Sequence, residues 1–303
     1  MYESKDPIDE LVHLYVDGAF NRRELFSRVA RKTGGMAAAV AALSIYPEVQ
    51  AAENPGVPDG VRTAETDPEI ETRDVTFPGE AGILYGYLAV PKIAYSELQP
   101  GVMVIHENRG LTDHIKDVTR RAAKAGFVAL SVDLLSRQGG ISQFPEPTQQ
   151  TAAYNRTTQP ERRADMLSAL DYMKHLDMIV FDRIGITGFC AGGGNVWDFI
   201  VNFEEVAAAV PFYGAAPLVD DVARIQTPVL AIHAERDFNF SQRILPIVDA
   251  LSKARKPHGL FIYEAAGHGF HNDTGAAYNA DAAKDAWART IEFFNKWLRR
   301  PRR

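Results

Sequence analysis

The stretch Gly188-Phe189-Cys190-Ala191-Gly192-Gly193 contains the only cysteine of this 303-residue chain. Just before it, residues 183–187 (Arg-Ile-Gly-Ile-Thr) have the pattern of a short buried strand. Just after it, residues 195–202 have the pattern of a helix. The cysteine therefore lies at a predicted strand-to-helix corner, which is where the nucleophile of a G-x-S-x-G elbow stands.

The corner explains why the residues around Cys190 are small. A tight turn needs small neighbours, and the new helix directs backbone N–H groups and a partial positive charge at the sulfur. Both effects favour a thiolate and the oxyanion that its attack would create. The alternative is a buried structural cysteine, because free cysteine often behaves as a small hydrophobic residue. The combination of strand, glycines and helix favours the nucleophile.

Composition narrows the class of protein. The chain is long enough for one large domain or two small ones, and its net charge of −6 is mild. No basic stripe or zinc-finger spacing is present, which argues against nucleic acid as the main partner. One cysteine permits no intramolecular disulfide. No apolar run approaches membrane-spanning length.

Residues 1–68 differ from the rest and are interpreted as an N-terminal extension with a linker, followed by a catalytic domain at 69–303. Paired arginines in Asn21-Arg22-Arg23 precede a weakly apolar run at 34–46 and the small residues of Val49-Gln50-Ala51. This order resembles a twin-arginine export signal, with Asn in place of the usual Ser or Thr. A genuine signal would place the protein in the periplasm.

The second interpretation of this extension is a helical arm that stays attached, in a protein of the cytoplasm. It would consist of two helices, 7–17 and 22–43. Ile8, Leu11, Val12 and Tyr15 recur at helical spacing, which favours a helix in the first segment. Residues 54–68, rich in Pro, Gly and Asp, form the predicted linker. Both interpretations remain open at this point.

Strands and helices alternate from residue 72 onward. Two leading strands, 72–77 and 82–90, meet at Pro78-Gly79, and a continuous apolar strand follows at 102–106. Residues 136–160 are predicted to be a polar loop over the mouth of the site. The pattern predicts an α/β fold with a mostly parallel central sheet and helices on both faces. The further elements expected are strands at 128–132, 207–212, 229–233 and 260–263, and helices at 113–125, 161–175, 242–253 and 281–298.

Active sites in such sheets form beyond the carboxyl ends of the strands. Asp237 follows one predicted strand and His268 follows the next, so the chain order is nucleophile, acid, histidine, as in α/β-hydrolases. Cys190 would attack a carbonyl carbon and His268 would shuttle the proton. Asp237 would orient the imidazole and stabilise the imidazolium.

Each of these assignments has a rival. Glu235 or Asp133 could supply the acid, although Asp133 is also placed to cap a loop. His271 could be the base, but His268 stands between two glycines that allow close approach to the thiol. His268 and His271 could bind a metal together, yet no third ligand is spaced to complete that site. We therefore expect neither a metal nor a cofactor.

The loop after the first parallel strand, His106-Glu107-Asn108-Arg109-Gly110, holds the remaining candidates. The hydrolase fold takes one oxyanion-hole N–H from this loop and one from the residue after the nucleophile. Asn108 and Ala191 are the matching backbone donors. Glu107 could pair with Arg109 at the surface or face the thiol, and its place at a strand end favours the second.

Together these motifs resemble the dienelactone hydrolase family over residues 72–298. The resemblance rests on His-Glu-Asn-Arg-Gly at 106–110, Asp133-Leu134, Gly-Phe-Cys-Ala-Gly-Gly at 188–193, Pro211-Phe212-Tyr213-Gly214 and Gly-His-Gly-Phe-His-Asn at 267–272. It implies an α/β-hydrolase fold and a carboxylic ester hydrolase of the carboxymethylenebutenolidase type. It also implies that Glu107 holds the resting thiol and accepts its proton when substrate displaces it.

The chain departs from that family at one point. Members acting on dienelactone carry an arginine shortly after the catalytic histidine, whereas this chain has Phe270-His271-Asn272-Asp273. Losing that cation removes a charge-assisted clamp worth about 1.5–3 kcal/mol per bond, which puts dienelactone itself in doubt. An arginine from another loop could replace it. Candidate substrate contacts are Arg109, Arg137, Arg156, Tyr213 and His271.

The sequence therefore predicts a cofactor-free hydrolase that cleaves a small ester or lactone through a thioacyl-enzyme. The alternative from another class is a non-catalytic hydrolase fold used for binding or as a structural partner, which the retained triad disfavours. A carbon–halogen or carbon–carbon hydrolase would usually have Asp or Ser at the elbow, so Cys190 argues against both. A homodimer is compatible with the sequence, which does not fix the oligomeric state.

Overall fold

A computed structural model describes residues 7–16, 19, 22–46, 49 and 62–299. Its core is one eight-stranded sheet in the order β1-β2-β4-β3-β5-β6-β7-β8. The leading strands β1 and β2 pair antiparallel, β2 pairs antiparallel with β4, and the remaining neighbours are parallel. The strands are β1 (Ile70–Gly79), β2 (Gly82–Pro91), β3 (Gln99–Ile105), β4 (Val128–Val132), β5 (Ile179–Phe189), β6 (Ala208–Phe212), β7 (Val229–Ala234) and β8 (His258–Tyr263).

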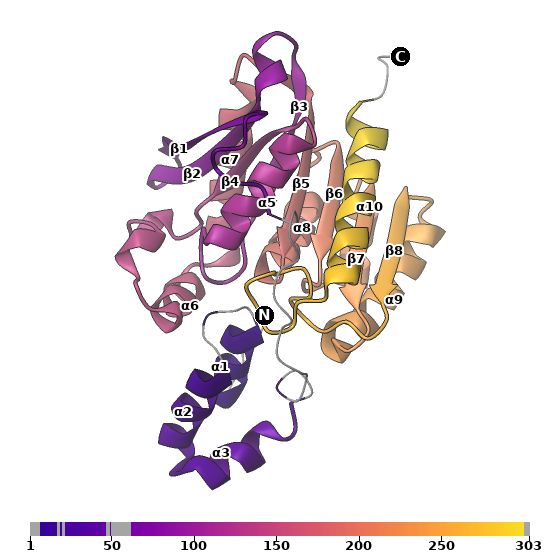
Figure 1. The fold of residues 1–303 in the computed structure, drawn as a ribbon. Helices are drawn as coiled ribbons and strands as arrows, with labels where there is room; N and C mark the ends of the chain where they lie inside the picture. The colour runs from indigo at the N-terminus through magenta and orange to yellow at the C-terminus, as the bar shows by residue number, and fades with distance from the viewer. Residues whose placement is uncertain (1–6, 17–18, 20–21, 47–48, 50–61, 300–303) are drawn as a thin grey trace.

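Helices cover both faces of the sheet (Figure 1). On β3, Met103 and Ile105 belong to the core cluster under α7, α8 and α9, while Val102 and Val104 belong to the cluster under α5 and α10. A strand buried on both faces has no polar side, which explains its continuous apolar sequence. These helices are α5 (Asp113–Lys124), α7 (Gln159–Lys174), α8 (Ala191–Asn202), α9 (Phe238–Lys253) and α10 (Ala280–Leu298). The mostly parallel sheet with helices on both faces confirms the predicted fold class.

One helix was not expected from the sequence. α6 (Pro147–Arg156) lies inside the stretch predicted to be a polar loop. Glu146 and Gln149 form a capping box at its start, and Pro147 occupies the first turn, where its missing N–H does no harm. The loop prediction for residues 147–156 is therefore wrong. Short 3-10 helices occur at η1 (Lys92–Tyr95), η2 (Ser136–Gln138), η3 (Ile141–Gln143) and η4 (Val219–Arg224).

The N-terminal extension contains three helices, α1 (Pro7–Val16), α2 (Arg22–Thr33) and α3 (Met36–Leu43). We refer to residues 7–46 as the arm. The single helix expected over 22–43 is broken at Gly34 and Gly35, whose φ angles of 85° and 157° no helix interior adopts. The export-signal interpretation of the same residues stays a prediction. Most of the predicted linker lies outside the described residues.

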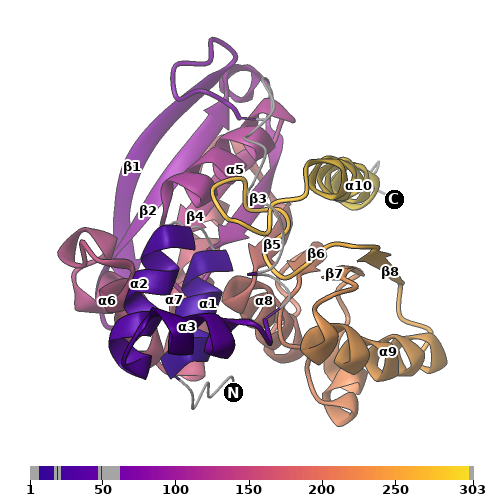
Figure 2. The same ribbon diagram turned by 60° about the horizontal axis from the view of Figure 1, so that its bottom comes forward.

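The arm has its own apolar cluster, and that cluster also contacts Ala276 and Ala277 in the loop between β8 and α10. Figures 1 and 2 show the arm beside that loop and α6, beyond the ends of the central strands. An ion pair of 3.8 Å joins Arg28 of α2 to Glu146 at the start of α6. The arm therefore lies over the end of the sheet at which the candidate residues were predicted to meet.

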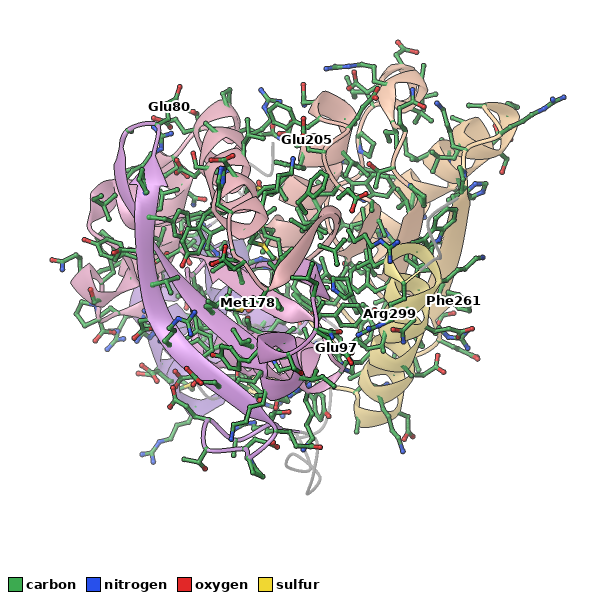
Figure 3. The ribbon with its side chains drawn as sticks, turned by 90° about the horizontal axis from the view of Figure 1, so that it is seen from above. Glu80, Glu97, Met178, Glu205, Phe261 and Arg299 are labelled. Atoms are coloured by element: carbon green, nitrogen blue, oxygen red, sulfur yellow. The ribbon has the colours of Figure 1, made fainter. Side chains whose placement is uncertain are left out.

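Polar contacts anchor the chain on either side of the sheet. Arg62 Nε donates to Asp273 Oδ2 at 2.7 Å, and Thr63 N donates to Asp117 Oδ1 at 2.8 Å. Arg299, just past α10, donates to Gln99 and to the Gly126 carbonyl, at the end of the sheet viewed in Figure 3.

None of the helices in the described part of the chain combines the length and the apolar character needed to cross a membrane.

Candidate active site

Cys190 occupies a sharp corner between β5 and α8. Its φ of 55° and ψ of −119° lie in a region that residues other than glycine rarely adopt. The glycines beside it are required by close backbone approach: a Cβ on Gly192 would lie 2.4 Å from His106 O, and one on Gly188 would lie 2.5 Å from Gly192 O. The corner presents the sulfur at the carboxyl end of β5, and Cys190 as a whole is 5% exposed.

His268 and Asp237 meet at the ends of β8 and β7. Asp237 stands at the N-cap of α9, and its Oδ2 is 2.5 Å from His268 Nδ1, with both residues buried. Burial disfavours the protonated imidazole, but the negative charges of Asp237 and Cys190 outweigh it and raise the pKa of His268 well above its ordinary value. This environment favours the imidazolium form of His268.

The sulfur of Cys190 is bordered by two imidazoles. Sγ lies 3.3 Å from Nε2 of His13, which comes from helix α1 of the arm. Donor atoms of Cys190, His13 and His268 all lie within 4.8 Å of one another. The His13 and His268 rings are 5.1 Å apart between centroids. The candidate triad is therefore gathered at one place, with a further histidine in contact with its sulfur.

Glu107 is fully buried at the end of β3. Its two carboxylate oxygens accept hydrogen bonds of 3.2 and 3.0 Å from Asn272 Nδ2, and Arg109 Nη2 lies 3.9 Å from Oε2. Arg109 itself is also buried. Glu107 and Arg109 are therefore paired in the interior and not at the surface. The Asn272 contact links Glu107 to the loop that carries His268.

The predicted oxyanion donors lie in the loop after β3 and at the first residue of α8. Ala191 is the first residue of α8, so its N–H is one of the four that a helix leaves without an internal acceptor. Asn108 directly follows Glu107 and is 9% exposed. Among the described residues, its side-chain Oδ1 has no hydrogen-bond partner.

The rival acids have other partners. Glu235 Oε2 accepts the N–H of Ala265 at 2.9 Å. The Asp133 carboxylate accepts the N–H groups of Leu135 at 3.0 Å and Ile141 at 2.7 Å, so it organises the loop after β4. Of the acids considered from the sequence, Asp237 is the one in contact with His268.

His271 lies in an aromatic interior rather than in an open site. Its ring stacks on Phe189 at 4.9 Å and lies 5.2 Å from Phe212 and 5.9 Å from Trp287. Neither ring nitrogen has a hydrogen-bond partner within the described residues. Burial, followed by the neighbouring charges of Arg121 and His114, lowers the pKa of His271 well below its ordinary value.

The other candidate substrate contacts differ in their surroundings. Arg137 Nε is 2.9 Å from Asp165, and its guanidinium also reaches Glu80 and Glu161, so this arginine braces α7. Arg156 is exposed at the end of α6. Tyr213 has a φ of 33° at the end of β6, and its ring lies 5.1 Å from that of His268. Tyr213 is thus the candidate that directly adjoins the imidazole.

Two residues near the sulfur were not predicted from the sequence. His13 was read only as part of an arm, and Tyr154 belongs to α6, which was expected to be loop. Tyr154 accepts a hydrogen bond from Asn195, and Arg162 lies 4.6 Å over its ring. Burial raises the pKa of Tyr154, and the nearby charge on Cys190 adds to that effect. The Pro147 start signal of α6 was visible in the sequence, whereas nothing local pointed to the position of His13.

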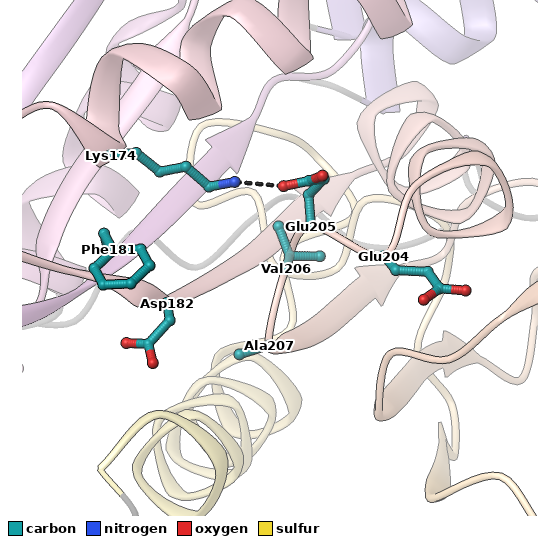
Figure 4. Close-up of a pocket in the computed structure, with 7 residues that line it drawn as sticks. All are labelled: Lys174, Phe181, Asp182, Glu204, Glu205, Val206 and Ala207. Atoms are coloured by element: carbon teal, nitrogen blue, oxygen red, sulfur yellow. Dashed lines mark hydrogen bonds and ion pairs between the residues drawn. The ribbon is translucent and has the colours of Figure 1, made fainter. Parts of the chain in front are cut away.

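A separate surface pocket lies at the opposite end of the sheet (Figure 4). It has a volume of about 310 Å³ and includes the ion pair between Lys174 and Glu205. Its residues precede the strands β5 and β6 or begin them, and none of them was a candidate from the sequence. The pocket is lined by Lys174, Phe181, Asp182, Glu204, Glu205, Val206 and Ala207.

The sheet order, the antiparallel leading strands and the elbow define an α/β-hydrolase. Comparison with known proteins gives the family. A sequence profile described as "Dienelactone hydrolase family" matches residues 84–298, well over half of the chain. The chain belongs to the dienelactone hydrolase family.

Individual relatives agree with this assignment. A Synechocystis protein named "Putative carboxymethylenebutenolidase" is 32% identical over 251 residues, covering 76% of this chain and 99% of that protein. A protein of the same name from Methylorubrum extorquens is 30% identical, covering 74% of this chain and 80% of the relative. A crystal structure from Klebsiella pneumoniae, named "Putative Dienelactone Hydrolase", superposes with a TM-score of 0.68 at 26% identity, covering 75% of this chain and 99% of that one. The protein is a hydrolase of the dienelactone hydrolase type.

Proposed function

We propose that the protein hydrolyses a small carboxylic ester or lactone through a Cys190–His268–Asp237 triad and a thioacyl-enzyme. The observation that carries this proposal is the arrangement at the strand ends. Cys190 stands on a strained elbow, and a donor nitrogen of His268 lies within 4.8 Å of its sulfur. The other nitrogen of that imidazole is held by Asp237 at 2.5 Å.

The first half of the reaction forms a thioester. The Cys190 thiolate attacks the carbonyl carbon, and the negative charge moves to the carbonyl oxygen, which the backbone N–H groups of Asn108 and Ala191 are proposed to stabilise. The tetrahedral intermediate then collapses, the C–O bond breaks, and the alkoxide leaves with the proton of the His268 imidazolium. In a lactone the leaving alkoxide stays attached to the acyl group.

The second half releases the acid. Neutral His268 takes a proton from water, and the resulting hydroxide attacks the thioester carbon. The C–S bond breaks, the carboxylic acid leaves, and the thiolate–imidazolium pair is restored. Asp237 stabilises the imidazolium in both halves. No cofactor enters these steps.

Glu107 is proposed to hold the resting thiol and to accept its proton when substrate displaces it, which gives the attacking thiolate; the proton returns to the sulfur after the acid has left. The buried carboxylate is compatible with such a role because Asn272 and Arg109 stabilise its charge next to the site. Arg109, adjacent to Asn108, is the arginine that we propose for binding a substrate carboxylate. Arg137 is less suited, because three carboxylates already surround its guanidinium.

Hydrolysis of p-nitrophenyl acetate by wild type and by Cys190→Ala tests the nucleophile. We expect release of p-nitrophenol to fall to the background rate in the variant, while its thermal unfolding stays that of a folded protein. Cys190→Ser is the matched control for size. A screen of lactones and short esters, with and without a carboxylate, then defines the substrate class. Equal rates for wild type and Cys190→Ala would remove Cys190 from the mechanism.

A further inference from the structure

Helix α1 carries a histidine to the thiol from a position 177 residues away in sequence. The neighbours of His13 on α1, among them Val12 and Leu14, are buried in the arm's apolar cluster. The same cluster packs on Ala276 and Ala277, in the loop that also carries His268. The position of the half-buried His13 ring is therefore set by packing on both sides, and its Nε2 lies 3.3 Å from Cys190 Sγ.

The three donors have the spacing of a nearly closed metal site. In a tetrahedral zinc site, bonds of about 2.3 Å to sulfur and about 2.0–2.1 Å to nitrogen place neighbouring ligand atoms about 3.3–3.6 Å apart. The His13–Cys190 contact already has this length. The widest separation in the cluster is within 4.8 Å. Closing it takes a shift of about 1.2 Å at most, which small side-chain rotations supply.

The surroundings also match a metal site. His268 Nδ1 is bound to the Asp237 carboxylate, which leaves Nε2 directed to the cluster. A carboxylate behind a ligating histidine fixes its tautomer and strengthens it as a ligand. The side chain that His268 meets on this side is Cys190, whose sulfur is itself a proposed ligand.

We propose that the arm completes a binding site for Zn²⁺ at the nucleophile, with Cys190 Sγ, His268 Nε2 and His13 as its ligands. One thiolate and two imidazoles suit Zn²⁺ and do not suit Mg²⁺ or Ca²⁺, which take oxygen ligands. Three protein ligands leave a fourth position for water. Cys190 and His268 belong to the hydrolase fold itself, whereas the third ligand comes from the arm.

Binding switches the thiol off. Zinc–sulfur and zinc–nitrogen bonds form as the proton that the Cys190–His268 pair holds, on Sγ or on Nε2, passes to solvent, and nothing is oxidised or reduced. The cation then occupies both the sulfur and the Nε2 atom that would move protons, so ester hydrolysis stops until the metal is removed. This blocking effect rests on the proposed function, whereas the binding itself does not.

Zinc binding by the full chain tests the site directly. Metal-free wild type, His13→Ala, His13→Gln and Cys190→Ser would be titrated with Zn²⁺ in competition with a chromophoric chelator, after circular dichroism has shown that each is folded. We expect wild type to bind one Zn²⁺. His13→Ala and His13→Gln should each bind it at least about 10-fold more weakly, because even the outer partners of metal ligands change affinity by about 10–100-fold. His175→Ala, at an exposed site past α7, is the matched control and should bind as wild type does.

Co²⁺ provides a readout independent of activity. Wild type loaded with Co²⁺ should show thiolate-to-cobalt charge-transfer absorption in the near ultraviolet, and Cys190→Ser should not. Equal Zn²⁺ affinities for wild type and both His13 variants would overturn the proposal, as would full affinity in Cys190→Ser. Hydrolysis by the metal-free enzyme is measured in parallel. If the metal-free enzyme is inactive but binds Zn²⁺ through His13, the proposed function alone is refuted. If it is active but its Zn²⁺ affinity does not depend on His13, this site alone is refuted.

Discussion

Replacing Asp237 with Asn tests the contact on which the candidate triad depends most. The carboxylate lies 2.5 Å from His268 Nδ1 in a buried environment. Its charge opposes the effect of burial and raises the pKa of His268. Asn keeps the shape and removes the charge, so burial would again dominate and the pKa of His268 would fall.

The size of the effect has two parts. Loss of one charge-assisted hydrogen bond costs about 1.5–3 kcal/mol, which is about 10–150-fold in rate. An Asn amide can also donate to Nδ1, which places the imidazole proton on Nε2 and prevents that nitrogen from acting as a base. The same inversion in the Ser-His-Asp template costs about 10⁴-fold. We therefore expect kcat/KM to fall by about 10²–10⁴-fold.

The assay is p-nitrophenyl acetate hydrolysis at pH 7, with iodoacetamide alkylation of Cys190 followed across pH as a second readout. As the pH is lowered, we expect the alkylation rate of Asp237→Asn to decline at a higher pH than that of wild type. The reason is that the variant loses the imidazolium that stabilises the thiolate. Glu235→Gln is the control, because Glu235 accepts a backbone N–H instead. It should stay within about twofold of wild type. A folded Asp237→Asn enzyme within about fivefold of wild type, or an equal loss in Glu235→Gln, would refute the reasoning.

Two further predictions concern stability. Gly192→Ala should lower the free energy of unfolding by about 1–3 kcal/mol in urea titrations, because the new Cβ meets His106 O and Ile105 O at 2.4 Å. Gly194→Ala on the same helix is the control, since its Cβ meets its nearest atom at 3.4 Å. An equal loss of stability in both variants would contradict the argument. Burial lowers the pKa of His233 to about 4. Since the unfolded chain binds this proton near pH 6.5, stability should be complete above that pH and fall by about 1.4 kcal/mol per unit down to about pH 4. The free energy of unfolding of His233→Gln should depend less on pH, by that slope. An unchanged slope would contradict the prediction.

Local sequence was sufficient for the sheet and the elbow. Continuous apolar runs predicted the buried strands, and glycines beside one cysteine predicted a corner that only small neighbours permit. These features depend on residues close together in the chain. The two missed features of the helices also had local signals, namely Pro147 with Glu146 and Gln149 for α6, and the Gly34-Gly35 pair for the break in the arm.

The surroundings of the thiol could not be predicted in this way. Asn272 stabilises the Glu107 carboxylate from 165 residues away, and His13 reaches Cys190 from 177 residues away. Neither contact leaves a periodicity or a spacing in the sequence, because each depends on how segments far apart in the chain pack together. Family motifs predict a nucleophile, a base and an acid, but they lie within residues 72–298 and say nothing about the arm.

The state of the arm in the cell connects the export question to the chemistry of the site. Cleavage after the small residues near Ala51 would remove His13 together with the paired arginines, and the mature periplasmic enzyme would keep Cys190 and His268 without the third ligand. Retention would keep all three. N-terminal sequencing of protein from its native host distinguishes the two, and zinc titration of the same sample checks the consequence. We expect a chain that still contains residues 7–16 to bind Zn²⁺ more tightly than one that begins after Ala51; equal affinities would mean that the helix does not serve the cation site.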